Sequence, residues 1–336
     1  MNLYDMTNDE LIEKLPCISL VNPLKTIDKK TNKQNIDKIK LIYKYIHNTD
    51  FQPKHLIYPT WLKDINNVKN KVKEHSTTSE TERAYYTAVL STLSRIDKDK
   101  YKSLIDTYRE LQNTTQKNVL KIRQTNIQTI DEKRNWMDWD DIVKYTDDNW
   151  TSKDKLIKAL YTSIPPRRLE YGNLILTEEN TFDNTKNYLV MIGKEPYFIL
   201  LNRYKTYKKY GTYIINLQNK EVDGLNYLNY KSLLDAIKLY LKENNIKNGD
   251  YLFGKNYGSD FGKELNKVWE LTNKNISVDI LRHSFITDFL KNIRHSEVND
   301  AFLKQYSDAM ANSSQMFLTY RKIEEDKFKM VNVKYV

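Results

Sequence analysis

Apolar side chains recur at helical spacing over much of the first half of the chain. The clearest stripe follows Ser79 and consists of Tyr86, Val89, Leu90, Leu93 and Ile96. Steps of mostly three residues keep these side chains on one face of a helix. Ser79 and Glu82 match the capping box that begins such a helix. The segments 61–73 and 98–111 carry similar stripes, so we predict a small all-helical domain over residues 51–115.

The first 50 residues are mixed in character. Segments 8–15 and 35–47 have apolar positions near helical spacing and are predicted to be helices. The run 29–40 is basic and polar, which is typical of a solvated face and also of an arm that contacts DNA. Residues 1–50 are therefore interpreted as an N-terminal helical and basic region, with both interpretations of its charge open.

A second domain is predicted over residues 135–325, after a polar segment at 116–134 that has the composition of a linker. Its first helix, 153–163, ends at Pro165-Pro166 because a residue before proline disfavours the helical conformation. Further helices are predicted at 231–243, 259–272, 277–292, 297–310 and 313–323, before a basic C-terminal tail at 326–336.

Three short segments of this second domain are typical of strands. Tyr, Val and Ile are enriched in them, and turn-like residues separate them, at 187–193, 197–204 and 212–217. The chain is therefore predicted to be mainly α, with a small three-stranded antiparallel sheet in the second domain.

Composition excludes several classes of protein. The 336 residues suggest two domains, and the 40% of hydrophobic residues argues against a wholly disordered chain. No apolar run reaches the roughly 18 residues of a membrane span, and the polar, acidic start is unlike a signal peptide. The single cysteine, Cys17, excludes an internal disulfide framework and a cysteine-rich zinc site. We expect an intracellular protein that does not enter a membrane.

The formal net charge of +10 favours an anionic partner. Only 11 of the 54 basic residues are arginine, and the excess of lysine and asparagine is typical of an AT-rich genome. Each arginine is therefore informative, because its planar guanidinium binds phosphate in a bidentate manner. Arg167, Arg168 and Arg282 are the most interesting of them.

Signatures of metal and nucleotide chemistry are missing from the sequence. It has no GxGxxG, no phosphate-binding loop and no HExxH, and its five histidines do not form a ligand cluster. We therefore expect a protein that uses neither a metal ion nor a cofactor.

Three segments combine cations with tyrosine or with an apolar helix face: 165–170, 203–211, and 279–285 followed by 317–322. Arg282 lies between Leu281 and Phe285, and a charge at the edge of a buried face needs a partner. That partner could be Asp279, one helical turn earlier, or a phosphate supplied by a ligand.

Together these segments resemble the tyrosine recombinase (phage-type integrase) family. Arg167, three residues before Glu170, matches the first arginine of that family, and Lys205 in Tyr-Lys-Thr matches its lysine. The Leu-Arg-His-Ser stretch around Arg282 matches the second arginine, and Tyr320 matches the nucleophile. The resemblance covers 135–325, and the helical region before it is similar to the family's core-binding domain. In its lysine and asparagine bias, the chain resembles the integrases of large DNA viruses, virophages and mobile elements.

Two positions depart from the family pattern. Asp279 stands where the first residue of a His-x-x-Arg motif is expected, and Asn312 stands at a later His or Trp position. A carboxylate about 4 Å from a phosphate would repel it by about 4 kcal/mol at an effective dielectric of 20. Asp279 would therefore face Arg282 and orient it, be protonated, or turn away. Asn312 can donate a neutral hydrogen bond to a phosphate oxygen.

The resemblance implies a reaction without metal or ATP. Arg167 and Arg282 would hold the non-bridging oxygens of a phosphodiester, and Tyr320 would attack and form a covalent 3′-phosphotyrosine. Lys205 would protonate the leaving 5′-oxygen. Arg168, Lys208 and Lys209 would contact the DNA backbone; Lys208 and Lys209 are also alternatives to Lys205, as Arg168 is to Arg167.

The resemblance also implies partners and a compartment. These are double-stranded DNA, self-association as a tetramer on two duplexes, and the host nucleus or a cytoplasmic viral factory. Three alternatives stay open: a type IB topoisomerase, a catalytically impaired DNA-binding relative, and an unrelated helical scaffold in which the motif arises by chance.

Overall fold

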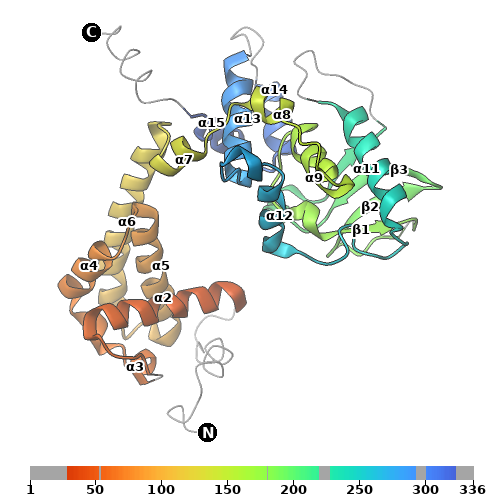
Figure 1. The fold of residues 1–336 in the computed structure, drawn as a ribbon. Coiled ribbons are helices and arrows are strands. Elements are labelled where there is room, and N and C mark those ends of the chain that lie inside the picture. The colour runs from red at the N-terminus through yellow and green to blue at the C-terminus, as the bar shows by residue number, and fades with distance from the viewer. Residues whose placement is uncertain (1–28, 53, 180, 219–227, 293–299, 323–336) are drawn as a thin grey trace, which may run out of the picture. The chain divides into compact units, whose positions relative to one another are not determined.

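The computed structural model describes residues 29–52, 54–179, 181–218, 228–292 and 300–322 (Figure 1). The chain divides into two compact units between Thr125 and Asn126, a point inside the predicted linker. The predicted helix at 8–15 and the predicted tail at 326–336 lie outside the described residues. No helix of the described ranges has the length and apolar character needed to cross a membrane.

The first unit is all helical where it is described. Its elements are α2 (Lys29–His47), α3 (Lys54–Ile57), η2 (Thr60–Lys63), α4 (Ile65–Glu74), α5 (Ser79–Asp97) and α6 (Lys102–Gln124). The predicted stripe on α5 packs into the core of this unit, with Tyr86, Val89 and Leu93 fully inaccessible and Leu90 and Ile96 half-buried. The cap differs by one residue from the prediction, because the Thr78 hydroxyl accepts the Thr81 amide.

The second unit surrounds a small sheet with helices. Before the sheet come α7 (Ile130–Asn135), α8 (Trp139–Lys144), α9 (Ser152–Thr162) and η3 (Glu170–Asn173). After it come α11 (Tyr230–Asn244), η4 (Gly258–Asp260), α12 (Phe261–Lys267), η5 (Glu270–Thr272), α13 (Val278–Asn292), α14 (Asp300–Ala309) and α15 (Ser314–Thr319). Helix α9 packs against α11 and α12, and α11 also contacts β3 (Figure 1).

The sheet has four strands in the order β1-β2-β3-β4 and is mixed. Strands β2 (Asn187–Ile192), β3 (Glu195–Leu201) and β4 (Tyr213–Asn216) are antiparallel neighbours and confirm the three predicted strands. The short helix α10 (Tyr207–Tyr210) lies between β3 and β4.

The prediction of a purely antiparallel three-stranded sheet is wrong in one respect. Strand β1 (Leu174–Thr177) adds a fourth strand, parallel to β2. Its four residues, Leu-Ile-Leu-Thr, are all buried and too few to show a period. Its extended state depends on hydrogen bonds to distant residues, among them Leu176 N–H to the Asp250 carbonyl at 2.9 Å.

Gly172 in η3 is a point of close packing beside the turn 165–170, which carries Arg167 and Arg168 and is called the arginine turn. A β-carbon there would lie 2.6 Å from Cβ and Cγ of Phe261, whereas one at Gly262 would meet only Leu169, at 3.5 Å. We expect Gly172→Ala to lower the free energy of unfolding by about 1–3 kcal/mol. Gly262→Ala, inside α12, should raise it by up to about 1 kcal/mol. Chemical denaturation measures both, and shifts in the same direction would contradict the packing argument.

Candidate functional site

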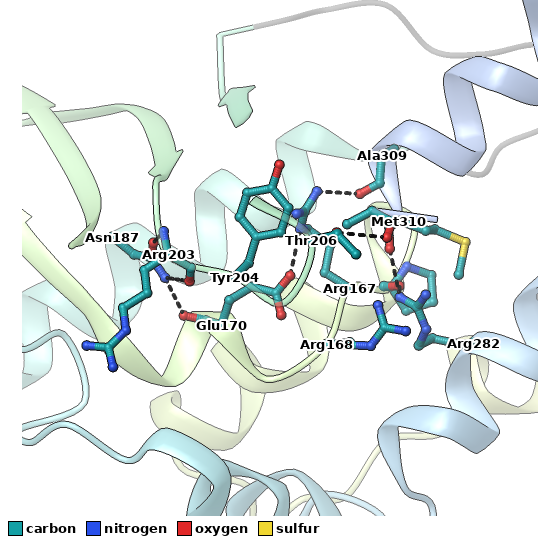
Figure 2. Close-up of polar contacts among 12 residues, drawn as sticks. Arg167, Arg168, Glu170, Asn187, Arg203, Tyr204, Thr206, Arg282, Ala309 and Met310 are labelled. Carbon is teal, nitrogen blue, oxygen red and sulfur yellow. Dashed lines mark hydrogen bonds and ion pairs between the residues drawn. The ribbon is translucent and has the colours of Figure 1, made fainter. Parts of the chain in front are cut away.

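The predicted arginine turn follows α9 and buries Arg167 completely (Figure 2). Its Nε lies 3.0 Å from Oε1 of Glu170, three residues later, and its Nη1 donates to the Ala309 carbonyl at 2.7 Å. The guanidinium carbon also lies 4.8 and 4.5 Å from the ring centres of Tyr204 and Tyr213. Arg167 is therefore a buried cation with one carboxylate partner and two aromatic neighbours.

Arg282 on α13 is fully buried as well. Its Nη1 donates to the carbonyls of Pro166 and Met310, at 2.8 and 3.1 Å. Burial, and then the charge of nearby Arg168, lower the pKa of Arg282. Asp279 is exposed, so within the described residues the hydrogen bonds of Arg282 go to carbonyls and not to that carboxylate.

Arg168 extends to the other side of the same turn and reaches Tyr320. Its Nη2 lies 3.4 Å from the Tyr320 hydroxyl, and its carbonyl accepts the hydroxyl of Tyr161 at 2.5 Å. Arg168 and Arg282 lie side by side in Figure 2, and the Arg282 guanidinium carbon is 5.3 Å from the centre of the Tyr320 ring. The contact between Arg168 and Tyr320 is a feature that the sequence analysis did not predict.

Tyr320 lies just after α15, because that helix ends at Thr319 and not at the predicted residue 323. Its ring is half-buried and meets the ring of His283 edge to face, with 4.7 Å between centres. His283 therefore faces the tyrosine ring. In the sequence, only its position next to Arg282 suggested that His283 lies near the site.

Asn312 joins the site through the turn that follows α14. It is 5% exposed, and its backbone amide donates to the Ser307 carbonyl at 2.8 Å. The same turn supplies the carbonyls of Ala309 and Met310, which accept from Arg167 and Arg282. The turn that contains Asn312 thus also binds both buried arginines through its backbone carbonyls.

Lys205 lies in the turn between β3 and α10, and its side chain is exposed. It forms no hydrogen bond or ion pair with another described residue. The structure therefore does not bring its amine to the arginines. Lys208 and Lys209 on α10 are exposed too.

Asn187 links the turn between β3 and α10, which carries Lys205, to the arginine turn, as Figure 2 shows. It is 1% exposed, and its Oδ1 accepts the amides of Asn202 and Arg203 at 3.0 and 2.7 Å. Its Nδ2 donates to the carbonyls of Glu170 and Arg203 at 3.2 and 3.0 Å. This side chain fixes the backbone two residues before Lys205.

Thr206 holds the other side of the same turn. Its hydroxyl donates to the Ala311 carbonyl at 3.2 Å, next to Asn312. The backbone around Lys205 is therefore attached both to the arginine turn and to the turn after α14, although the side chain itself is exposed.

Several buried donors of this site lack a hydrogen-bond partner among the described residues. They include the guanidinium nitrogens Nη2 of Arg167, Nη1 of Arg168, and Nε and Nη2 of Arg282, together with the amide Nδ2 of Asn312. A buried N–H group without an acceptor costs about 1–3 kcal/mol, and more when it is charged. Among the described residues, only one of the three guanidinium groups, that of Arg167, pairs with a carboxylate, that of Glu170. The arrangement therefore suits an anion with several oxygen atoms.

Comparisons with protein-family models, with curated proteins and with solved structures give no match for this chain.

Proposed function

We propose that this protein cuts and rejoins double-stranded DNA through a covalent phosphotyrosine on Tyr320, as a site-specific recombinase or integrase. One observation carries the proposal. The Tyr320 hydroxyl lies 3.4 Å from Arg168, beside buried guanidinium donors that lack partners. A nucleophilic oxygen next to unfilled oxyanion donors is the arrangement that phosphoryl transfer requires.

The bound group is a phosphodiester. Its two non-bridging oxygens accept hydrogen bonds from several N–H groups, and their negative charge balances the positive charge of the arginines. Arg168 and Arg282 hold these oxygens, and Asn312 adds a neutral donor. Arg167 pairs with Glu170 at 3.0 Å and so stabilises the arginine turn. Its Nη2 group, which has no partner among the described residues, is a further donor for the phosphodiester.

The reaction is a transesterification in which bonds are exchanged one for one. The Tyr320 oxygen attacks phosphorus and gives its proton to water, while the bond from phosphorus to the 5′-oxygen breaks. Lys205, in its tethered turn, gives a proton to the leaving 5′-oxygen. Attack by a 5′-hydroxyl on the phosphotyrosine reverses these steps and reseals a strand.

The charge of the first unit supports DNA as the substrate. Its described part, residues 29–125, contains 20 basic and 10 acidic residues, a net charge equal to that of the whole chain. Cationic helices that contact phosphates bind DNA without regard to sequence and weaken steeply with salt. The first unit therefore supplies affinity for DNA, and the second unit carries out the strand cleavage and rejoining. The assembly on DNA is proposed to be a tetramer.

A covalent trap tests the proposal. A pool of duplexes with randomised centres, each nicked so that the cleaved strand dissociates, is incubated with the protein at low salt with EDTA. We expect a protein–DNA adduct that survives denaturation, with the nucleotide on Tyr320 in the peptide mass spectrum. A randomised pool makes a negative result meaningful although the target site is unknown.

The other outcomes separate the alternatives. A salt-sensitive gel shift without any adduct would indicate a DNA-binding relative that has lost catalysis. Adduct formation with relaxation of supercoiled plasmid, but without strand exchange, would indicate a type IB topoisomerase. Absence of both adduct and gel shift would overturn the proposal.

A further inference from the structure

Glu132 on α7 is a carboxylate that contacts the site from a distant part of the sequence. Its Oε1 lies 2.9 Å from Nδ1 of His283 and 3.0 Å from Nζ of Lys322. Its Oε2 accepts the Thr129 amide at 2.8 Å, as part of the capping box that begins α7. Both oxygens are thus engaged, which fixes the carboxylate in one orientation.

The contacts of Glu132 are shielded from water. Its side chain is 15% exposed, and those of His283 and Lys322 are 16% and 13% exposed. Burial alone would raise the pKa of Glu132, but its contacts with His283, the Thr129 amide and Lys322 lower it to about 2. Glu132 is therefore an anion at any pH at which the protein would act.

Both partners of Glu132 flank Tyr320. The His283 ring meets the Tyr320 ring edge to face at 4.7 Å, and Lys322 follows Tyr320 by two residues. The backbone amide of Lys322 also donates to the Thr287 hydroxyl at 2.8 Å. One carboxylate therefore holds the ring on one side of Tyr320 and the chain that follows it.

We infer that Glu132 is a positioning residue for Tyr320. It acts through His283 and Lys322 and holds the tyrosine ring with its hydroxyl beside Arg168. The inference rests on the proposed function, in which Tyr320 is the nucleophile. A nucleophile must stay close to its attack geometry, and small displacements of a reacting group cost large factors in rate.

The test compares two neighbouring carboxylates of α7. Glu132→Gln keeps the size of the side chain but removes its charge and replaces one oxygen by an NH2 group. The single remaining oxygen cannot face His283 and Lys322 and also accept the Thr129 amide from the other side. Asp131→Asn is the matched control, because Asp131 is 83% exposed and its one ion pair with a described residue is with Arg134. His283→Gln and Lys322→Met remove the two partners and serve if Glu132→Gln fails to fold.

Two quantities are measured on each variant. The first is the single-turnover rate of adduct formation at saturating DNA, together with the DNA dissociation constant. The second is the rate at which tetranitromethane nitrates Tyr320, read by mass spectrometry on the tryptic peptide 305–321, where buried Tyr306 is an internal reference. The nitration rate reports the freedom of the ring and requires no catalysis.

For Glu132→Gln we expect the adduct rate to fall about 10- to 100-fold, with the dissociation constant within about twofold. Nitration of Tyr320 should rise at least about threefold, because the ring loses its fixed neighbours. Asp131→Asn should match the wild type in both. A double variant with His283→Gln should be no slower than the slower single variant, since both changes break one chain of contacts.

Each result distinguishes this inference from the proposed function. Unchanged nitration in Glu132→Gln would overturn the inference even if the adduct rate fell. Increased nitration in a protein whose wild type forms no adduct would support the positioning of Tyr320 and overturn the proposed reaction.

Discussion

Tyr320→Phe is expected to abolish the covalent adduct with DNA, a loss on the order of 10⁴-fold or more, the scale seen when an enzyme loses its nucleophile. The phenyl ring has no oxygen to attack phosphorus, and the guanidinium groups around it cannot replace one. The measurement is the yield of denaturation-resistant complex from the nicked duplex pool described above.

DNA binding should change little in the same variant. The substitution removes a single hydroxyl, 3.4 Å from Arg168 Nη2, and leaves the ring that packs against His283. We expect the dissociation constant to stay within about threefold of the wild type, since phosphate contacts dominate the affinity. Tyr210→Phe, on α10, is the matched control and should keep full adduct formation. An adduct formed by Tyr320→Phe would show that another residue is the nucleophile.

Asn187→Asp is expected to have the largest effect on stability, lowering the free energy of unfolding by about 3–5 kcal/mol. The amide of Asn187 donates to the carbonyls of Glu170 and Arg203, at 3.2 and 3.0 Å. An ionised aspartate would face both carbonyls with an oxygen, in a position that is 1% exposed. The midpoint of thermal unfolding should fall by about 10 °C.

The penalty in Asn187→Asp should depend on pH with a defined sign. Burial against carbonyls raises the pKa of the new carboxyl above its value in the unfolded chain, so the folded state binds the proton more tightly. The loss is therefore smallest below about pH 4 and grows as the pH rises through the folded-state pKa. Asn184→Asp, on an exposed loop, should show neither the loss nor the pH dependence. A pH-independent difference would contradict the hydrogen-bonding scheme of Asn187.

The local rules of the sequence account for much of the fold. The stripe on α5 predicts its buried face, and the two prolines predict the end of α9. These features depend on residues a few positions apart, so the pattern of the chain is sufficient to predict them.

The fourth strand and the geometry of the site could not be predicted from such local patterns. β1 is a strand because β2 and residues near 250 supply its hydrogen bonds. Glu132 reaches His283 and Lys322 across more than 150 residues, and no motif marks it. Nothing in the sequence distinguishes Asn187 from other strand residues, and only the structure shows its four hydrogen bonds.

By itself, the sequence determined which residues carry groups suited to the proposed phosphoryl transfer: the arginines, Lys205, Asn312 and Tyr320. Only the tertiary structure decided their geometry. It buried Arg167 against Glu170, directed Arg168 to the Tyr320 hydroxyl, and left Lys205 exposed. The physical reason is that adjacent residues in a non-helical turn point in different directions. Which of them meets a residue about 150 positions away depends on how the helices pack.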